Sequence, residues 1–135
     1  MDKAELINLL GQNEAFDTAP PEALDSLVEA AALETLPDSS PMIQQGRSGE
    51  SIWMLLEGEL DILVDGEQVN HIAEKGEVVG EISAVSQTAA TATVQSKGEV
   101  TALAIPQEAL HEVMSTSPQL AASMLRSMAK YLGRR

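Results

Sequence analysis

Hydrophobic residues recur with two different periods along this 135-residue chain, and each period predicts a different kind of secondary structure. Within residues 1–35, the apolar residues at 24, 27, 28 and 31 have the spacing of one buried helical face. Pro21 is favoured in a first helical turn and marks where this helix begins. A shorter apolar cluster at residues 6–10 predicts a helix before it, so two N-terminal helices are expected.

Short apolar runs separated by glycines follow from about residue 36 to residue 106, a pattern typical of many short strands. Residues 52–56 form a continuous apolar run. Asp65-Gly66 predicts a type I′ hairpin turn, because both central residues of that turn need a positive φ. An antiparallel barrel or jelly roll is the economical assembly of such strands, since closing the sheet removes exposed edges.

The helical period returns in residues 107–135. Pro106 begins one helix, and the pair Ser117-Pro118, a capping residue followed by proline, begins the last one. This last helix is predicted to end at Gly133 and carries one apolar stripe of Ala121, Met124, Leu125, Met128, Tyr131 and Leu132. The chain is thus predicted to be a single, mainly β domain of residues 1–135. Its jelly-roll barrel (double-stranded β-helix) lies between two N-terminal and two C-terminal helices.

Composition places the chain among globular proteins and removes several classes of function. Apolar residues make up 44% of it, no apolar run has the length of a membrane span, and the first residues lack the features of a signal peptide. Cysteine is absent, which excludes disulfides, thiol catalysis and zinc thiolates. We expect a cytoplasmic protein with no membrane partner. The Met1 start favours an intact N-terminus, while a stand-alone protein and a domain of a longer regulator both stay open.

The net charge of −13 argues against nucleic acid as a direct partner, because such binding depends on cations that neutralise phosphates. Four of the eight basic residues lie in the last ten positions, namely Arg126, Lys130, Arg134 and Arg135. Favourable placement of cations at a helix C-terminus explains this cluster. A docking tail for an acidic partner stays open as the alternative.

One segment carries the clearest chemical signal in the chain. Residues 76–84 read Gly-Glu-Val-Val-Gly-Glu-Ile-Ser-Ala, and small and hydroxyl residues follow as far as Thr91-Ala92-Thr93-Val94. This order resembles the phosphate-binding cassette of the cyclic-nucleotide-binding domain family, of the catabolite activator and protein kinase A regulatory subunit type. The resemblance implies that a helical turn after Gly80 offers backbone N–H groups to a cyclic phosphate.

The resemblance extends over nearly the whole chain. Residues 41–46, 50–55 and 56–60 resemble early strands of the family, with Trp53 where an aromatic residue is common. The element order is also similar: two helices, about eight strands with a helical turn between the sixth and seventh, and two more helices. It implies N-terminal helices in 1–35, a barrel in 36–106 that holds the cassette at 76–94, and C-terminal helices in 107–135.

By this resemblance the ligand-binding residues are Val79, Gly80, Glu81, Ile82, Ser83, Ala90 and Thr91. Glu81 is the expected acceptor for a ribose hydroxyl, and Thr91 is able to touch the phosphate. Two structural alternatives stay open. Gly80 serves only as the turn from strand to helix, and N–H groups of its own helical turn satisfy the Glu81 carboxylate.

The cassette departs from the family pattern at one position, where Ala90 replaces the arginine that clamps the phosphate. No basic residue lies between Lys75 and Lys97. Loss of one partner from a buried charge pair costs about 2–5 kcal/mol, so weak or lost affinity for cAMP and cGMP is expected. Arg47 and Arg126 are candidates for a substitute cation, against the simpler interpretation that both are ordinary surface residues.

Enzyme chemistry finds little support in the sequence. Its two histidines are His71, on an expected strand, and His111, on an expected helix, whereas metal-binding jelly rolls use several histidines on neighbouring strands. It has neither a Ser/His/Asp order nor a phosphate-binding P-loop. We expect no catalysis, no metal site and no bound cofactor.

These patterns predict a non-enzymatic sensory or regulatory module with a degenerate cassette and a small-molecule effector. Three alternatives stay open: a true cAMP or cGMP receptor, a site for a less anionic molecule, and a protein-interaction or dimerisation module with a closed cavity. The resemblance also implies that the last helix acts as a lid, a dimer seam or a lever on an effector. Its apolar stripe is a candidate for such a seam, and packing against the chain's own barrel explains the stripe equally well.

Overall fold

The computed structural model describes residues 1–86 and 88–132, without the side chains of Ser86, Tyr131 and Leu132. The predicted helix end at Gly133 and the basic residues Arg134 and Arg135 lie outside this description. The chain forms two compact units. The helical unit consists of Met1–Ala31 and Glu108–Arg135, and the sheet unit consists of Ala32–Gln107.

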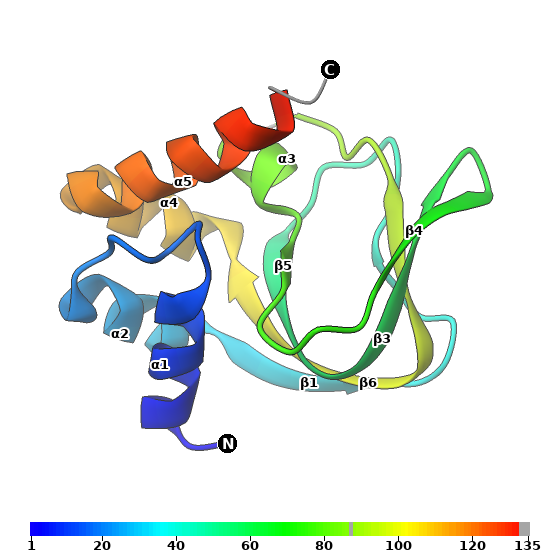
Figure 1. The fold of residues 1–135 in the computed structure, drawn as a ribbon, viewed down its shortest axis with the longest axis horizontal. Coiled ribbons are helices and arrows are strands. Elements are labelled where there is room, and N and C mark those ends of the chain that lie inside the picture. The colour runs from blue at the N-terminus through cyan, green and yellow to red at the C-terminus, as the bar shows by residue number, and fades with distance from the viewer. Residues whose placement is uncertain (87, 133–135) are drawn as a thin grey trace. The chain divides into compact units, whose positions relative to one another are not determined.

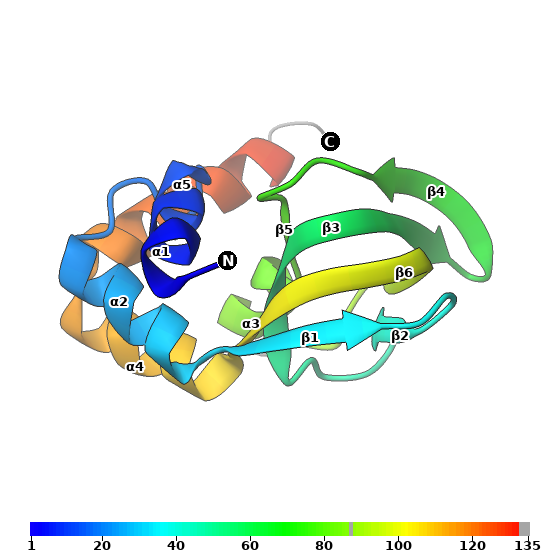
Figure 2. The same ribbon diagram turned by 90° about the horizontal axis from the view of Figure 1, so that it is seen from below.

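The sheet unit is one antiparallel sheet that contains a short helix. Its elements are β1 (Ala32–Leu36), β2 (Pro41–Ile43), β3 (Ser51–Val64), β4 (Glu67–Ile72), β5 (Val78–Val79), α3 (Glu81–Ser86) and β6 (Thr93–Pro106). Figure 2 shows β1, β6, β3 and β4 side by side in that order. The short strand β2 pairs with the long strand β6. The short strand β5 pairs with the long strand β3 (Figure 1).

The described residues form six strands, which corrects the expectation of about eight. Where two separate strands are expected, the structure has the single long strand β3. The same is true of β6. Gly58 lies within β3 and has a positive φ of 99°. The pairing of β3 with β6 shifts register on both sides of Glu57. A bulge of this kind bends a strand without ending it, so the glycines mark bends as well as turns.

The predicted hairpin between β3 and β4 is confirmed. Asp65 and Gly66 have φ angles of 53° and 84°, as a type I′ turn requires. The side chain of Gln45 fixes this turn, because its Nε2 donates to Asp65 Oδ1 at 3.0 Å and its Oε1 accepts from the Asp65 N–H at 2.8 Å.

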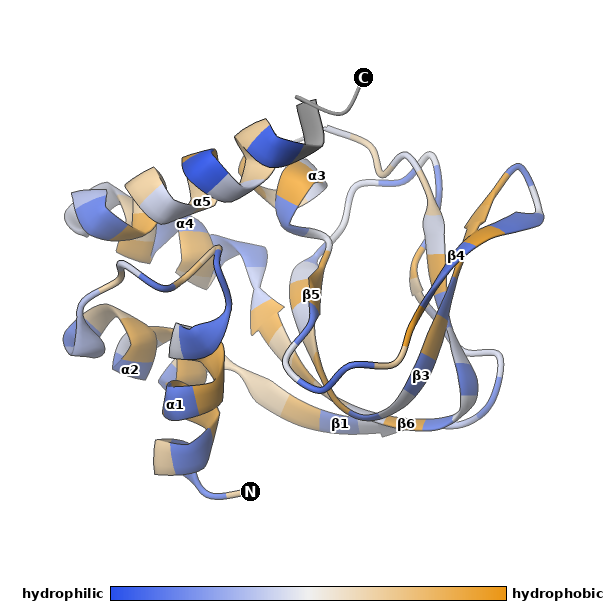
Figure 3. Ribbon diagram, in the orientation of Figure 1, coloured by the Kyte–Doolittle hydropathy of each residue, from blue (hydrophilic) through white to orange (hydrophobic). Residues whose placement is uncertain are grey.

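An apolar cluster forms the core of the sheet unit. Its buried members are Ile43, Leu55, Leu60, Val79, Ala90, Val94, Val100 and Ala102, and four half-buried side chains pack against it, those of Met42, Trp53, Ile62 and Ile72. Figure 3 shows hydrophobic residues on both β5 and α3, where the cassette joins the sheet. Part of the cassette therefore belongs to the core and has its position fixed by it.

The helical unit contains the helices that the sequence predicts. They are α1 (Lys3–Gln12), α2 (Pro21–Ala30), α4 (Gln107–Thr116, whose first residue belongs to the sheet unit) and α5 (Pro118–Leu132). Asp2 caps α1 through its carboxylate, which accepts the N–H of Glu5 at 2.9 Å. Among the described residues, no helix has the length and apolar character needed to cross a membrane.

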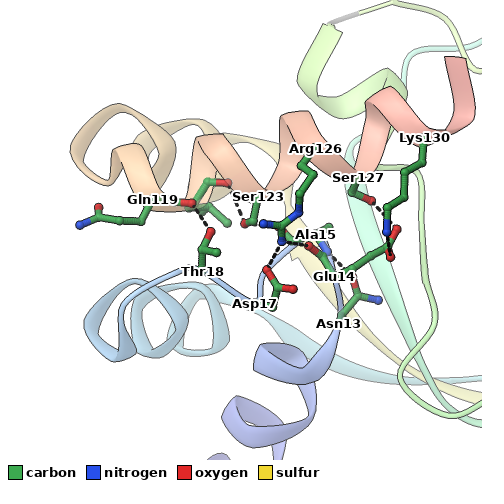
Figure 4. A network of polar contacts seen from close by, with 11 residues as sticks. Asn13, Glu14, Ala15, Asp17, Thr18, Gln119, Ser123, Arg126, Ser127 and Lys130 are labelled. Carbon is green, nitrogen blue, oxygen red and sulfur yellow. Dashed lines mark hydrogen bonds and ion pairs between the residues drawn. The ribbon is translucent and has the colours of Figure 1, made fainter. Parts of the chain in front are cut away.

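Polar contacts join α5 to the segment between α1 and α2 (Figure 4). The buried Ser123 hydroxyl donates to the Ala15 carbonyl at 2.8 Å. Lys130 forms an ion pair with Glu14 at 2.8 Å, and Arg126 forms one with Asp17. The guanidinium of Arg126 is thus paired within the helical unit rather than free in solvent.

The buried face of α5 differs from the predicted stripe. Leu120, Ser123 and Met124 are fully buried, whereas 70% of Leu125 is exposed. The prediction that Leu125 shares one face of the helix with Met124 is therefore wrong. Of the other stripe residues, Ala121 and Met128 are half-buried. The side chains of Tyr131 and Leu132 lie outside the described part of the chain. The helix turns Ser123 inward because its hydroxyl has carbonyl partners there, at Ala15 and Leu120.

Adjacent positions on α5 should respond in opposite ways to a new charge. Met124→Glu places an unpaired carboxylate at a fully buried position, so we expect it to reduce the free energy of unfolding by about 2–5 kcal/mol or more. Leu125→Glu, one residue further on, should change it by less than about 0.5 kcal/mol. Urea denaturation of both variants measures this, and equal losses would contradict the assignment of the buried face.

Candidate functional site

The cassette begins where strand β5 turns into helix α3 at Gly80. Val78 and Val79 pair with Met54 and Trp53 of β3, and the Gly80 carbonyl then accepts the N–H of Ala84 at 3.1 Å. Gly80 has a φ of 90°, which favours glycine. Gly80 therefore has the structural role that the sequence left open, that of the turn from strand to helix.

Gly80 also lies against the core of the sheet unit. A Cβ atom at this position would be 2.8 Å from Ile43 Cδ1 and 3.4 Å from the Ser51 carbonyl oxygen. Ile43 belongs to the same apolar cluster as Val79 and Ala90. The first part of the cassette and position 90 therefore meet on one cluster, although ten residues separate them in the chain.

The loop of residues 44–50 holds both parts of the cassette. The Gly46 N–H donates to the Ala90 carbonyl at 2.8 Å, and the Ala90 N–H donates to the Arg47 carbonyl at 2.9 Å. Further along the loop, a Cβ atom on Gly49 would lie 3.6 Å from the Ser83 hydroxyl oxygen. Arg47 of this loop is predicted as a candidate cation, whereas the main-chain contacts of the loop with Ala90 could not be predicted from the sequence.

The residues that follow α3 alternate between surface and core. Ala90 is 8% exposed and belongs to the apolar cluster, while its neighbours Ala89 and Thr91 are exposed. Of the other predicted ligand-binding residues, Ile82 is 43% exposed and Ser83 is half-buried. The structure thus brings Val79, Gly80 and Ala90 together and places Ile82 and Thr91 at the surface.

Glu81 is the charged residue of the cassette that the fold buries. Only 8% of it is exposed, and its Oε2 atom has no hydrogen-bond partner among the described residues. Burial raises the pKa of this carboxyl, its own backbone N–H lowers it, and the charge of Glu77 raises it further. The sequence left open that N–H groups of its own helical turn satisfy the Glu81 carboxylate. This holds for one carboxylate oxygen only, because Oε2 has no partner among the described residues.

No cation compensates this carboxylate within the cassette, since residues 76–94 contain no Lys, Arg or His. Arg47 is exposed, and no ion pair of its guanidinium occurs among residues 1–86 and 88–132. Arg126 pairs with Asp17. The environment of Glu81 is therefore poor in positive charge and favours a neutral carboxyl.

The two histidines lie outside the cassette. His71 on β4 contacts Asp61 and Glu59 of β3, each at 3.1 Å, on an exposed part of the hairpin. His111 is half-buried on α4. Within the described part of the chain, no group of three or more His, Cys, Asp or Glu side chains has an arrangement that could hold a metal ion.

Comparison with known proteins gives a consistent result. The sequence profile of the family described as "Cyclic nucleotide-binding domain" matches residues 33–117. The chain is 29% identical over 114 residues to the cAMP-dependent protein kinase regulatory subunit of Debaryomyces hansenii. It is 25% identical over 118 residues to the cGMP-dependent protein kinase 2 of Mus musculus. These alignments cover 83% and 87% of this chain but 25% and 15% of the relatives, so the chain spans a small part of their length.

Solved structures share the fold. The sensor domain of the transcriptional regulator DNR from Pseudomonas aeruginosa has a TM-score of 0.83 at 17% identity, covering 98% of this chain and 92% of that one. The regulatory domain of Toxoplasma gondii PKA, solved with cAMP, has a TM-score of 0.79 at 25% identity. The match covers 93% of this chain and 48% of that one. The regulatory subunit of a cAMP-independent protein kinase A from Trypanosoma cruzi, bound to guanosine, has a TM-score of 0.80 at 18% identity. The match covers 97% of this chain and 44% of that one.

The turn at Gly80 should tolerate no side chain without loss of stability. Gly80→Ala strains a positive φ and brings a methyl group onto Ile43, so we expect it to cost about 1–3 kcal/mol in the free energy of unfolding. Gly46→Ala is the matched control, because its φ of 83° is similar but nothing lies within 4 Å of its new Cβ. Denaturation should show a larger loss for Gly80→Ala, partly recovered in the double variant Ile43→Val/Gly80→Ala. Equal losses for the two glycines would contradict a packing role.

The buried carboxyl of Glu81 should make stability depend on pH. Its folded-state pKa is raised above the ordinary value of 4.5, so its stabilising contribution is complete below 4.5 and is lost as the pH rises through the raised value. Glu81→Gln should abolish this loss, which denaturation at about pH 4.5 and about pH 8 measures. The variant Glu67→Gln, at an exposed position of β4, should keep the wild-type pH dependence. The same dependence in Glu81→Gln would show that another group causes it.

Proposed function

Because the chain belongs to the cyclic nucleotide-binding domain family, we propose that it is a non-enzymatic, regulatory ligand-binding module with weak or no affinity for cAMP and cGMP. The observation that carries the proposal is the environment of Ala90. Its side chain packs in the apolar cluster beside Val79 and Val94, at the position where the family resemblance places a phosphate-clamping arginine.

The energetic consequence of this replacement is large. A two-pronged contact between guanidinium and phosphate is among the stronger polar contacts in proteins. Loss of one partner of such a buried pair costs about 2–5 kcal/mol, which corresponds to about 30-fold to 4,000-fold in the dissociation constant. This supports weak or lost binding of a cyclic phosphate.

Two further features act in the same direction. The buried carboxyl of Glu81 has no cation in the cassette, so an anion close to it would meet repulsion whenever the carboxyl is ionised. The net charge of −13 also disfavours the approach of an anionic ligand. Both features are compatible with a ligand that carries no charge.

A second candidate function is a protein contact through the last helix. Leu125 favours it, because this large apolar side chain is 70% exposed on α5. On this alternative the chain acts as an interaction or dimerisation module. Light scattering of the wild type and of Leu125→Glu distinguishes the two, since the variant lowers the molecular mass only if α5 forms the contact.

Restoring the missing cation should restore nucleotide binding. We expect Ala90→Arg to bind cAMP or cGMP at least about tenfold more tightly than the wild type, because it supplies the charge-assisted phosphate contact. Ala89→Arg is the matched control, since it adds the same charge at an exposed neighbouring position. Titration calorimetry measures the affinities, and a rise in the thermal unfolding temperature with added cAMP, seen only in Ala90→Arg, shows that the variant is folded.

The wild type provides the decisive negative result. Micromolar affinity of the unmodified chain for cAMP or cGMP would contradict the proposal. If Arg47→Gln then abolished that affinity, the cation would be assigned to the loop of residues 44–50, whose Arg47 carbonyl accepts the Ala90 N–H.

A further inference from the structure

The β3–β4 hairpin carries a histidine that lies between two carboxylates. His71 of β4 is directly opposite Asp61 of β3, and Glu59 lies two residues before Asp61 on the same face of that strand. His71 Nδ1 is 3.1 Å from Asp61 Oδ1, and His71 Nε2 is 3.1 Å from Glu59 Oε1. A neutral imidazole has one N–H, so one ring nitrogen would present its lone pair to a carboxylate oxygen, whereas an imidazolium ion donates from both nitrogens. This geometry therefore fits the protonated ring.

The charged groups around His71 favour the same state. Hydrogen bonds to Asp61 and Glu59 raise the pKa of His71, while partial desolvation and the charge of Lys97 on β6 lower it, and the rise is the larger effect. Lys97 is the residue of β6 that pairs in register with Glu59. The Asp61 side chain is only 17% exposed, so solvent screens its contact with the ring less than it screens the half-exposed Glu59.

The same hairpin contacts the loop that holds the cassette. The Gln45 side chain forms two hydrogen bonds with Asp65 at the hairpin turn, and the Gln45 N–H donates to Thr93 Oγ1 at 3.0 Å. The next residue, Gly46, donates its N–H to the Ala90 carbonyl at 2.8 Å. Among the described strands, β4 pairs only with β3 and forms one edge of the sheet (Figure 2). Contacts that hold β4 against β3 therefore also steady the turn on which Gln45 rests.

We propose that His71 is a pH-sensitive switch: when protonated it holds β4 against β3 and, through Gln45, keeps the loop of residues 44–50 on the cassette. Loss of the proton turns one of the two contacts into repulsion between a lone pair and a carboxylate oxygen, which loosens the hairpin. Because the pKa of the ring is raised in the folded chain, the stabilising contact is complete below the ordinary value of 6.5 and is lost as the pH rises through the raised value. This regulation goes beyond the proposed function, since it does not depend on which ligand the module binds.

NMR of the full chain tests the proposal without a ligand. Ring ¹⁵N shifts of His71 should show both nitrogens protonated at low pH and a titration midpoint above 6.5. Amide hydrogen exchange, corrected for the intrinsic effect of pH on exchange, reports how firmly each segment is held. We expect the protection of the β4 amides and of the Ala90 amide to fall about two- to fivefold as the pH passes this midpoint, the modest size typical of a solvent-accessible ion pair.

Three variants separate the switch from its coupling to the cassette. His71→Gln keeps a polar side chain that does not titrate, so it should abolish the step at this midpoint in both segments. Gln45→Ala should keep the step in β4 and remove it at Ala90, because the contact between the hairpin turn and the loop is lost. Gln44→Ala, at the exposed neighbouring position, is the matched control and should keep both steps.

The results that would overturn the proposal differ from those that bear on cyclic nucleotide affinity. A His71 midpoint at or below 6.5 would overturn the switch. A step that persists unchanged in His71→Gln would assign it to another group, with the same consequence. A step in β4 with none at Ala90 in the wild type would overturn the coupling to the cassette. The affinity for cAMP or cGMP enters none of these measurements, so the proposed function is tested separately.

Discussion

A carboxyl group that is buried with no cation in its own segment, residues 76–94, is the constraint on which the site depends. Glu81 lies at the first turn of α3, directly after the Gly80 turn, so the fold leaves it little freedom to reach solvent. Ionisation there is opposed by burial and by the charge of Glu77. The carboxyl must therefore remain neutral or find a hydrogen-bond donor, and its ionised form would repel an anion beside it.

The geometry of the cassette does not depend on the missing cation. Backbone hydrogen bonds from Gly46 and to Arg47 hold Ala90 in place, and these bonds involve main-chain atoms only. The pairing of β5 with β3 and the positive φ of Gly80 hold the other end. Because the scaffold consists of main-chain contacts and apolar packing, the cassette keeps its shape without a basic side chain at position 90.

Features set by local sequence could be predicted, and features set by long-range contacts could not. The hairpin at Asp65-Gly66, the start of α2 at Pro21 and the strand-turn-helix at Gly80 each follow from one or two residues with special backbone preferences. The family and the flanking helices could likewise be inferred from motif order. The docking of loop 44–50 onto Ala90 could not, because it joins segments more than 40 residues apart through main-chain atoms. The apolar stripe of α5 was misplaced since hydrophobicity alone gives no hint that Ser123 finds carbonyl partners in the interior.

The titration of the Glu81 carboxyl carbon, followed by ¹³C NMR, tests the central claim most directly. We expect a midpoint above the ordinary glutamate value of 4.5, because burial opposes ionisation. A midpoint at or below that value would contradict a carboxyl that is buried with one oxygen unpaired.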